Sequence, residues 1–141
     1  MHPFLKIVLT VVLVAVGGVA ALFWLMVQPG GDGVVAALRL PDGTECMVTQ
    51  QCNWSAEPYT VALYTREKYG LWTWCYIDHE ATRWQRATMT YDPATDSVTI
   101  AQRGTVAAVL DRPARQFRLR GMGDRDFPQR TGVTPPFPFP L

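Results

Sequence analysis

The sequence is poor in the residue types that commonly carry catalytic chemistry or build a disulfide scaffold. Its 141 residues include three cysteines and two histidines, one of which, His2, lies beside the N-terminus. Three cysteines are too few for a small protein built on disulfides. The chain has no Gly-x-Ser-x-Gly elbow for a nucleophile and no glycine-rich loop for phosphate. The sequence therefore predicts no cofactor, and no motif in it indicates a hydrolase or a nucleotide-binding protein.

The sequence also lacks a strong excess of charge. Lys and Arg number 13 against 12 Asp and Glu, which gives a formal net charge of +1. A nucleic-acid-binding domain normally carries a clear basic excess, so we expect no nucleic-acid partner. Apolar residues make up 48% of the chain, which excludes disorder throughout. The length suits one domain of ordinary size.

One long apolar run is present, over residues 7–27, and it contains no charged residue. As a helix rising about 1.5 Å per residue it would span roughly 32 Å, which matches the hydrocarbon core of a bilayer. Pro29, followed by Gly30 and Gly31, ends the helical pattern. We therefore predict a short N-terminal segment over residues 1–6, a transmembrane signal anchor over residues 7–27 and a linker over residues 28–33.

The flanking charges predict the orientation of this helix. Lys6 and the α-amino group precede it, whereas Asp32 follows it before the first basic residue, Arg39. The positive-inside rule then places residues 1–6 in the cytoplasm and the rest of the chain outside it. The alternative is a cleaved signal peptide, because Gly18-Val19-Ala20 has small residues spaced as at a cleavage site. The apolar run nevertheless continues to Val27, beyond the usual length of a signal h-region.

Small residues on this helix form a candidate packing face. Gly17 and Ala21 have the four-residue spacing that lets a second helix approach closely in lipid. The alternative is that Gly and Ala are simply frequent in membrane helices.

The region over residues 34–120 shows a period of two, with turn residues between short apolar runs. Val34, Ala36 and Leu38 alternate with other residues in the first run, and Pro41-Asp42-Gly43 then predicts a turn. About eight such runs follow one another at close spacing. This pattern predicts an all-β domain, a small antiparallel β-sandwich or barrel.

The last segment, residues 121–141, is rich in proline and ends in Pro135-Pro136-Phe137-Pro138-Phe139-Pro140-Leu141. Proline at this density favours an extended chain and excludes a helix or a central strand. We expect a tail that is either extended or disordered. Phe137, Phe139 and Leu141 are candidate contacts with a partner, because a tail left bare in water rarely carries such apolar side chains.

Aromatic residues are concentrated in the β-region, and three of them alternate along one run. Trp72, Trp74 and Tyr76 share one face, while Cys75 and Ile77 point to the other. These three rings have two interpretations. They fill the core, or they form a stacking surface for a glycan, a peptide or a partner subunit.

The remaining residues with chemical potential are the cysteines and His79. Cys46 and Cys52 share a face but lie roughly 20 Å apart on an extended strand, so they cannot form a disulfide there. A Cys52–Cys75 disulfide across neighbouring strands stays open, as do buried apolar thiols. The cysteine spacing matches no common zinc site, so we expect no metal. His79, between Asp78 and Glu80, is a candidate general base or a solvated loop residue.

Together these features predict a non-enzymatic, single-span membrane protein. Its extracytoplasmic β-domain would serve as an interaction or accessory subunit of a larger membrane or envelope assembly. The expected partners are the lipid bilayer and other membrane or envelope proteins. The alternative is an envelope ligand-binding module that stacks the Trp72, Trp74 and Tyr76 rings on a glycan or peptide. A third possibility is an enzyme centred on His79.

Overall fold

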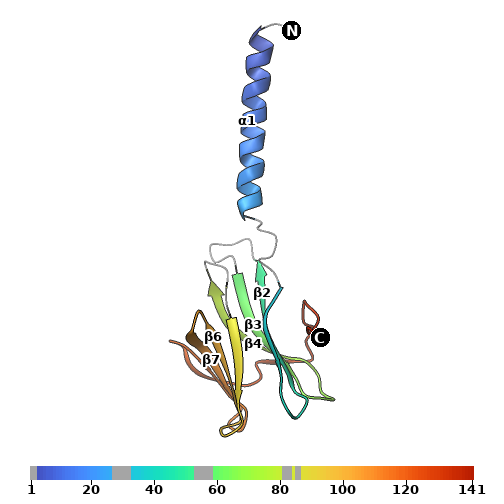
Figure 1. Cartoon of the computed structure of the whole chain (residues 1–141), viewed down its shortest axis with the longest axis vertical. Helices are drawn as coiled ribbons and strands as arrows, with labels where there is room; N and C mark the ends of the chain where they lie inside the picture. The colour runs from blue at the N-terminus through green and yellow to red at the C-terminus, as the bar shows by residue number, and fades with distance from the viewer. Residues whose placement is uncertain (1–2, 27–32, 53–58, 81–83, 85–86) are drawn as a thin grey trace. The chain divides into compact units, whose positions relative to one another are not determined.

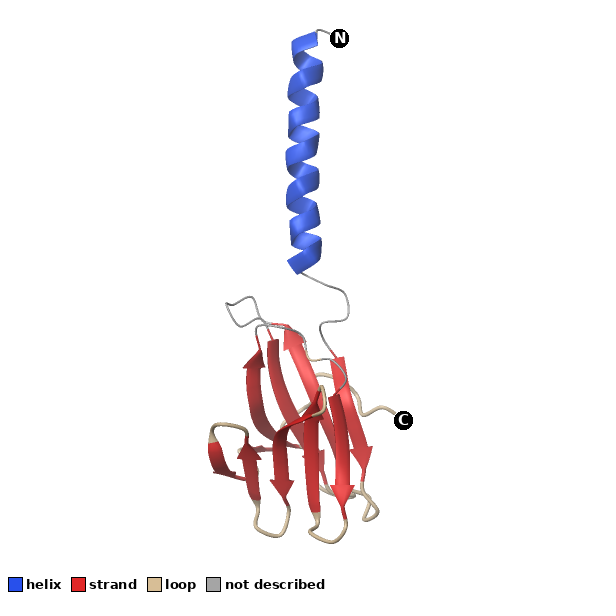
Figure 2. Ribbon diagram, turned by 60° about the vertical axis from the view of Figure 1, so that its left-hand side comes forward, coloured by secondary structure: helices blue, strands red, loops and turns tan. Residues whose placement is uncertain are grey.

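The computed structural model of the chain describes residues 3–26, 33–52, 59–80, 84 and 87–141, the side chains of residues 24–26 and 79–80 excepted. Within these residues one helix comes first and ten strands follow, arranged in two antiparallel sheets (Figures 1 and 2). The prediction of an all-β fold preceded by one apolar helix is therefore confirmed. The helix and the β-domain are separate compact units, and each is described by itself.

Helix α1 spans Pro3–Met26, and all its described side chains are exposed. It is long and apolar enough to cross a membrane. Thr10 is the one residue of the apolar run with a strongly hydrogen-bonding side chain, and its Oγ1 donates to the carbonyl of Lys6 at 2.9 Å. That bond satisfies the hydroxyl inside the helix, as an apolar environment requires. Gly17 and Ala21 both lie on α1, and a Cβ added at Gly17 would meet nothing within 4 Å.

The first sheet, sheet A, forms from the first four strands and the last one. Consecutive strands β1 to β4 pair as hairpin neighbours, and β10 adds to the free edge of β4. In spatial order its strands are β1 (Gly33–Arg39), β2 (Glu45–Cys52), β3 (Tyr59–Arg66), β4 (Thr73–Glu80) and β10 (Arg130–Thr131).

The second sheet, sheet B, is a simple antiparallel meander in which sequence neighbours are also spatial neighbours. Its strands are β5 (Ala87–Asp92), β6 (Ser97–Gln102), β7 (Thr105–Asp111), β8 (Gln116–Leu119) and β9 (Gly123–Asp126). Three turn residues, Asp96, Arg103 and Arg115, take left-handed backbone angles near φ 50°. Tight hairpin connections require such residues because they match the twist of the strands.

The two sheets share one apolar core. Cys46, Val48, Val61 and Leu63 contribute from sheet A, and each is at most 1% exposed. From sheet B the core takes residues that alternate along each strand, namely Val98, Ile100, Ala108, Leu110, Phe117 and Leu119. This alternation is the period of two that the sequence shows, and it places one face of each strand against the core.

Two details differ from the expected domain. The described part of the chain forms ten strands rather than about eight, and both extra strands lie beyond Arg120, where sequence analysis ended the β-domain. Strand β9 carries three charged residues in Gly123–Asp126, and β10 has only two residues. Neither has an apolar alternation, so their pairing depends on backbone hydrogen bonds to β8 and β4 rather than on burial.

Candidate functional site

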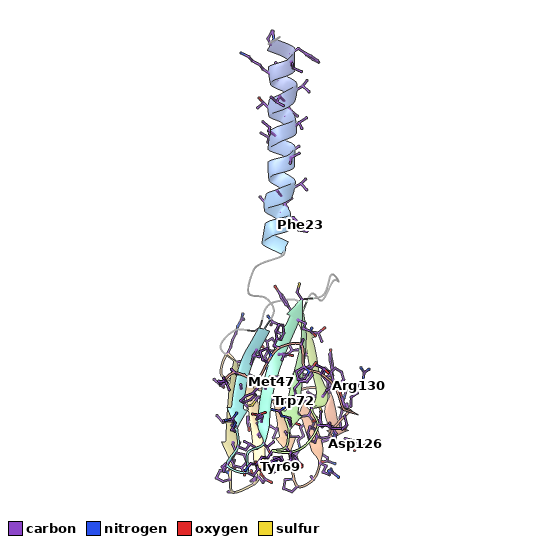
Figure 3. The ribbon with its side chains drawn as sticks, turned by 90° about the vertical axis from the view of Figure 1, so that its right-hand side faces the viewer. Phe23, Met47, Tyr69, Trp72, Asp126 and Arg130 are labelled. Carbon is purple, nitrogen blue, oxygen red and sulfur yellow. The ribbon has the colours of Figure 1, made fainter. Side chains whose placement is uncertain are left out.

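The two groups of candidate contact residues meet on the outer face of sheet A. Cys75 and Ile77 of β4 point into the shared core, so Trp74 and Tyr76 point to the opposite side. There Met47, Ala62 and Tyr64 form a second buried cluster, against which Trp72, Trp74, Val133 and Phe139 pack. We call this side of sheet A, defined by Met47, Ala62, Tyr64, Trp72 and Trp74, the aromatic face. Figure 3 shows Met47 and Trp72 on it.

The C-terminal segment, residues 133–141, lies across the aromatic face. It is led there by β10, since the amides of Gly132 and Val133 donate to the Trp72 carbonyl at 2.9 and 3.3 Å. Its side chains then alternate. The half-buried ones are Val133, Pro135, Phe137 and Phe139, while Thr134, Pro136, Pro138 and Pro140 are exposed. An extended chain laid on a surface has this period, so the segment uses every second side chain for contact.

Gln129, which precedes β10 and the C-terminal segment, makes two hydrogen bonds with β4. Its backbone amide donates to the Trp74 carbonyl at 3.2 Å, and its side-chain Oε1 accepts from the Tyr76 amide at 2.9 Å. The side-chain amide thus replaces a strand neighbour at a position that the two-residue β10 does not reach. The Tyr76 ring lies 6.5 Å from that of Trp74, centroid to centroid, with a tilt of 41°.

A charged trio borders the aromatic face. Arg39, Glu45 and Arg66 are cross-strand neighbours on β1, β2 and β3. The Glu45 carboxylate accepts a hydrogen bond from Arg39 at 2.8 Å and two from Arg66. Burial by itself would raise the pKa of Glu45, but the hydrogen bonds from Arg39 and Arg66 outweigh it and hold that pKa below its ordinary value.

The two arginines also stack on aromatic rings. The Arg66 guanidinium carbon lies 4.6 Å from the Trp72 ring centroid, and that of Arg39 lies 5.4 Å from the Phe139 ring centroid. Arg130 likewise lies 5.0 Å from the centroid of Trp74. Such cation–π contacts contribute about 0.5–1 kcal/mol each at exposed sites. They join the trio, the aromatic face and the C-terminal segment into one surface.

This surface contains a cavity of about 470 Å³ between the trio and the C-terminal segment. Phe137 and Leu141 line it from one side and Trp72 from the other.

Among the predicted contact residues, the structure thus brings together Trp72, Trp74, Tyr76, Phe137 and Phe139. Leu141 reaches the cavity but is otherwise fully exposed. Gly17 and Ala21 lie on α1, in the other unit.

Sequence reasoning missed the trio, although its signal was present. Arg39 and Glu45 stand at the two ends of the turn that Pro41-Asp42-Gly43 predicts, so a hairpin pairs them. Arg66 enters only through the register of β2 with β3, where it lies opposite Glu45. That register depends on long-range pairing, which the turn alone does not supply.

The remaining candidates are the three cysteines and His79. Cys46 and Cys75 are buried in the core, where burial raises their pKa values to about 12 and about 11. None of the three cysteines is in a disulfide. Strand β3 separates Cys52 on β2 from Cys75 on β4, so a bridge between them is excluded. The side chain of His79 lies outside the described residues, and those that are described hold no cluster of metal ligands.

The chain matches no protein-family model, no curated protein and no solved structure.

Proposed function

We propose that this chain is a non-enzymatic, single-span membrane protein whose β-domain is an interaction or accessory subunit of a larger membrane or envelope assembly. One observation carries the proposal. The aromatic face, the charged trio and the C-terminal segment form a single half-buried surface with an open cavity of about 470 Å³. Helix α1 would anchor this domain in the bilayer, with residues 1–6 in the cytoplasm and the β-domain outside it.

The composition of this surface suits contact with another protein. Trp, Tyr and Arg are the residues that most often dominate binding energy at protein interfaces. Here Trp72 and Arg66 stack on one another beside Glu45, which holds the Arg66 side chain in place. A side chain that is already ordered loses less conformational entropy when a partner binds. The trio therefore presents a partly rigid site rather than a set of mobile charges.

The glycan-binding alternative has less support from the same contacts. Stacking on a sugar requires an open ring face, and Arg66 and Arg130 lie over the rings of Trp72 and Trp74. A glycan would have to displace both guanidinium groups. A protein partner can instead use the exposed edges of the rings, the arginines and the cavity together.

Purification of the tagged full-length chain from its native membranes in a mild detergent tests this proposal. We expect the chain to migrate with partners at a mass well above that of a monomer. Phe137→Ala removes a half-buried ring that lines the cavity, and we expect it to reduce the recovered partner at least fivefold. Val106→Thr is the control, because Val106 is exposed on β7 of sheet B. A wild-type chain that runs as a clean monomer, or equal losses with both variants, would contradict the proposal.

A further inference from the structure

A second hollow lies away from the aromatic face, between the two sheets at one end of the β-domain. Its volume is about 300 Å³, at the lower end of the range of small-molecule sites. Leu110 and Phe127 line it from sheet B and its adjoining chain, and Leu71 lines it from the chain that enters β4. Leu71 is 68% exposed although it is a large aliphatic residue. Leu71 therefore offers the hollow apolar surface that the core does not use, whereas Leu110 belongs to the core and Phe127 packs against it.

Threonine side chains line the sheet A side of this hollow. Thr44, Thr65, Thr73 and Thr131 all line it. Thr65 and Thr73 share a hydrogen bond between their hydroxyl oxygens. These side chains thus place polar groups beside the apolar surface, a mixture that is typical of small-molecule sites.

Two arginines of the β7–β8 turn, Arg112 and Arg115, line the hollow, and they differ in whether their side chains have hydrogen-bond partners. Arg112 is fully engaged, because its guanidinium donates to Asp96 at 2.7 Å and also to Asp42. Arg115, in contrast, makes no side-chain hydrogen bond or ion pair with any residue that the structure describes. Its cation is therefore available to a ligand.

The backbone of Arg115 makes two hydrogen bonds, although its side chain has no partner among the described residues. Its amide donates to the Arg112 carbonyl at 3.2 Å, and its own carbonyl accepts from the Phe127 amide at 2.9 Å. Its φ is 53°, a left-handed value that is uncommon for a residue other than Gly, Asn or Asp. The turn thus fixes the starting point of this side chain at the rim of the hollow.

An exposed carboxylate lines the same hollow from sheet A. Glu67 lines the hollow from the β3–β4 turn of sheet A, and its side chain has no ion pair or hydrogen bond within the described part of the chain. The hollow is therefore lined by one cation, Arg115, and one anion, Glu67, and neither has an ion-pair partner among the described residues. A ligand that carried one charge would leave the other group without a partner.

We propose that this hollow is a binding site for a short apolar peptide with free termini, of about dipeptide size. The peptide carboxylate binds Arg115, its ammonium group binds Glu67, and its apolar side chains contact the exposed Leu71 and the half-buried Phe127. The proposal is independent of the function proposed above, because neither Arg115 nor Glu67 belongs to the aromatic face.

Isothermal titration calorimetry tests the site on the full-length chain in non-ionic detergent, with leucyl-leucine as the probe and a titration into empty micelles subtracted. We expect saturable binding of the free dipeptide. Its N-acetyl form and its C-terminal amide should each bind at least fivefold more weakly, because each loses one charged end. Equal binding of the free and capped forms would overturn the proposal, as would the absence of any saturable signal.

Matched variants separate the site from a general effect of charge. Arg115→Gln and Glu67→Gln should each weaken leucyl-leucine binding at least fivefold. Arg103→Gln is the control, because Arg103 is an exposed turn arginine with a closely similar φ of 51° and does not line the hollow. It should leave binding unchanged. An equal loss in Arg103→Gln and Arg115→Gln would overturn the assignment.

Discussion

Arg112 donates a hydrogen bond to the carboxylate of Asp42, and this pair connects the two sheets. Asp42 lies in the β1–β2 turn of sheet A, and Arg112 follows β7 of sheet B. The Asp42 carboxylate also accepts from the Thr44 amide at 2.9 Å. The Thr44 bond is the main cause, with help from Arg112, of a pKa of about 2 for Asp42.

This low pKa predicts how the stability of the β-domain depends on pH. A carboxylate with a lowered folded-state pKa contributes stability above its unfolded pKa, near 3.9, and loses it as the pH falls toward about 2. We expect Asp42→Asn to reduce the free energy of unfolding at pH 7 by about 0.5 kcal/mol, since the half-exposed carboxylate is screened by solvent. Denaturant unfolding at pH 7 and pH 2.5 measures the effect. A variant with the same loss at both values would contradict the assignment.

The cysteines should differ sharply in reactivity. Cys46 and Cys75 are fully buried with raised pKa values, whereas Cys52 is only half-buried. Since the thiolate is the reactive form, we expect iodoacetamide at pH 8 to label Cys52 alone in the folded chain and all three after unfolding. Mass spectrometry of the digested protein gives the sites. Rapid labelling of Cys46 without unfolding would show that the core is not packed as described.

The charged trio should stabilise the β-domain more than an ordinary surface ion pair does. Glu45→Gln removes the charge that both Arg39 and Arg66 bind. We expect a loss of about 1–2 kcal/mol, because charge-assisted hydrogen bonds to a largely buried carboxylate are lost. Asp124→Asn is the control. Its contact with Arg118 is 3.5 Å long and exposed, and it should cost less than about 0.5 kcal/mol. Chemical denaturation compares them, and equal losses would refute the distinction.

The C-terminal segment should shield the tryptophans of the aromatic face. Phe139→Ala removes a ring that packs against this face and lies under Arg39. We expect acrylamide to quench tryptophan fluorescence more strongly in this variant than in the wild type. Pro138→Ala, at an exposed position of the same segment, should change quenching little. A segment that did not lie on the sheet would give no difference between the two variants.

Local sequence patterns predicted most of the strands and turns. The turn at Pro41-Asp42-Gly43 occurs as expected, because the Gly43 amide donates to the Leu40 carbonyl and the Thr44 amide to the Asp42 carboxylate, each at 2.9 Å. The period of two also agrees with burial: in β8, Phe117 and Leu119 are buried and Arg118 between them is exposed. These features depend on neighbouring residues alone, so a single sequence reveals them.

Long-range pairing was beyond the same reasoning. Strand β10 pairs two residues, Arg130 and Thr131, with Thr73 and Trp74, more than fifty positions away. Nothing in a charged dipeptide predicts that partner. The position of the C-terminal segment follows from this pairing, so the sequence identified its apolar residues but not the surface that they cover. That the segment lies against the strand of Trp72, Trp74 and Tyr76 follows only from the pairing of β10 with β4.

We propose that α1 remains attached to the chain and anchors the β-domain in a bilayer. The most direct test expresses the full-length chain, washes the membranes with alkaline carbonate and measures the intact mass of the protein that stays. We predict that it remains in the membrane pellet at the mass of the uncleaved 141-residue chain. Release into the wash, or a mature chain that begins near Ala21, would show that α1 is not a lasting membrane anchor.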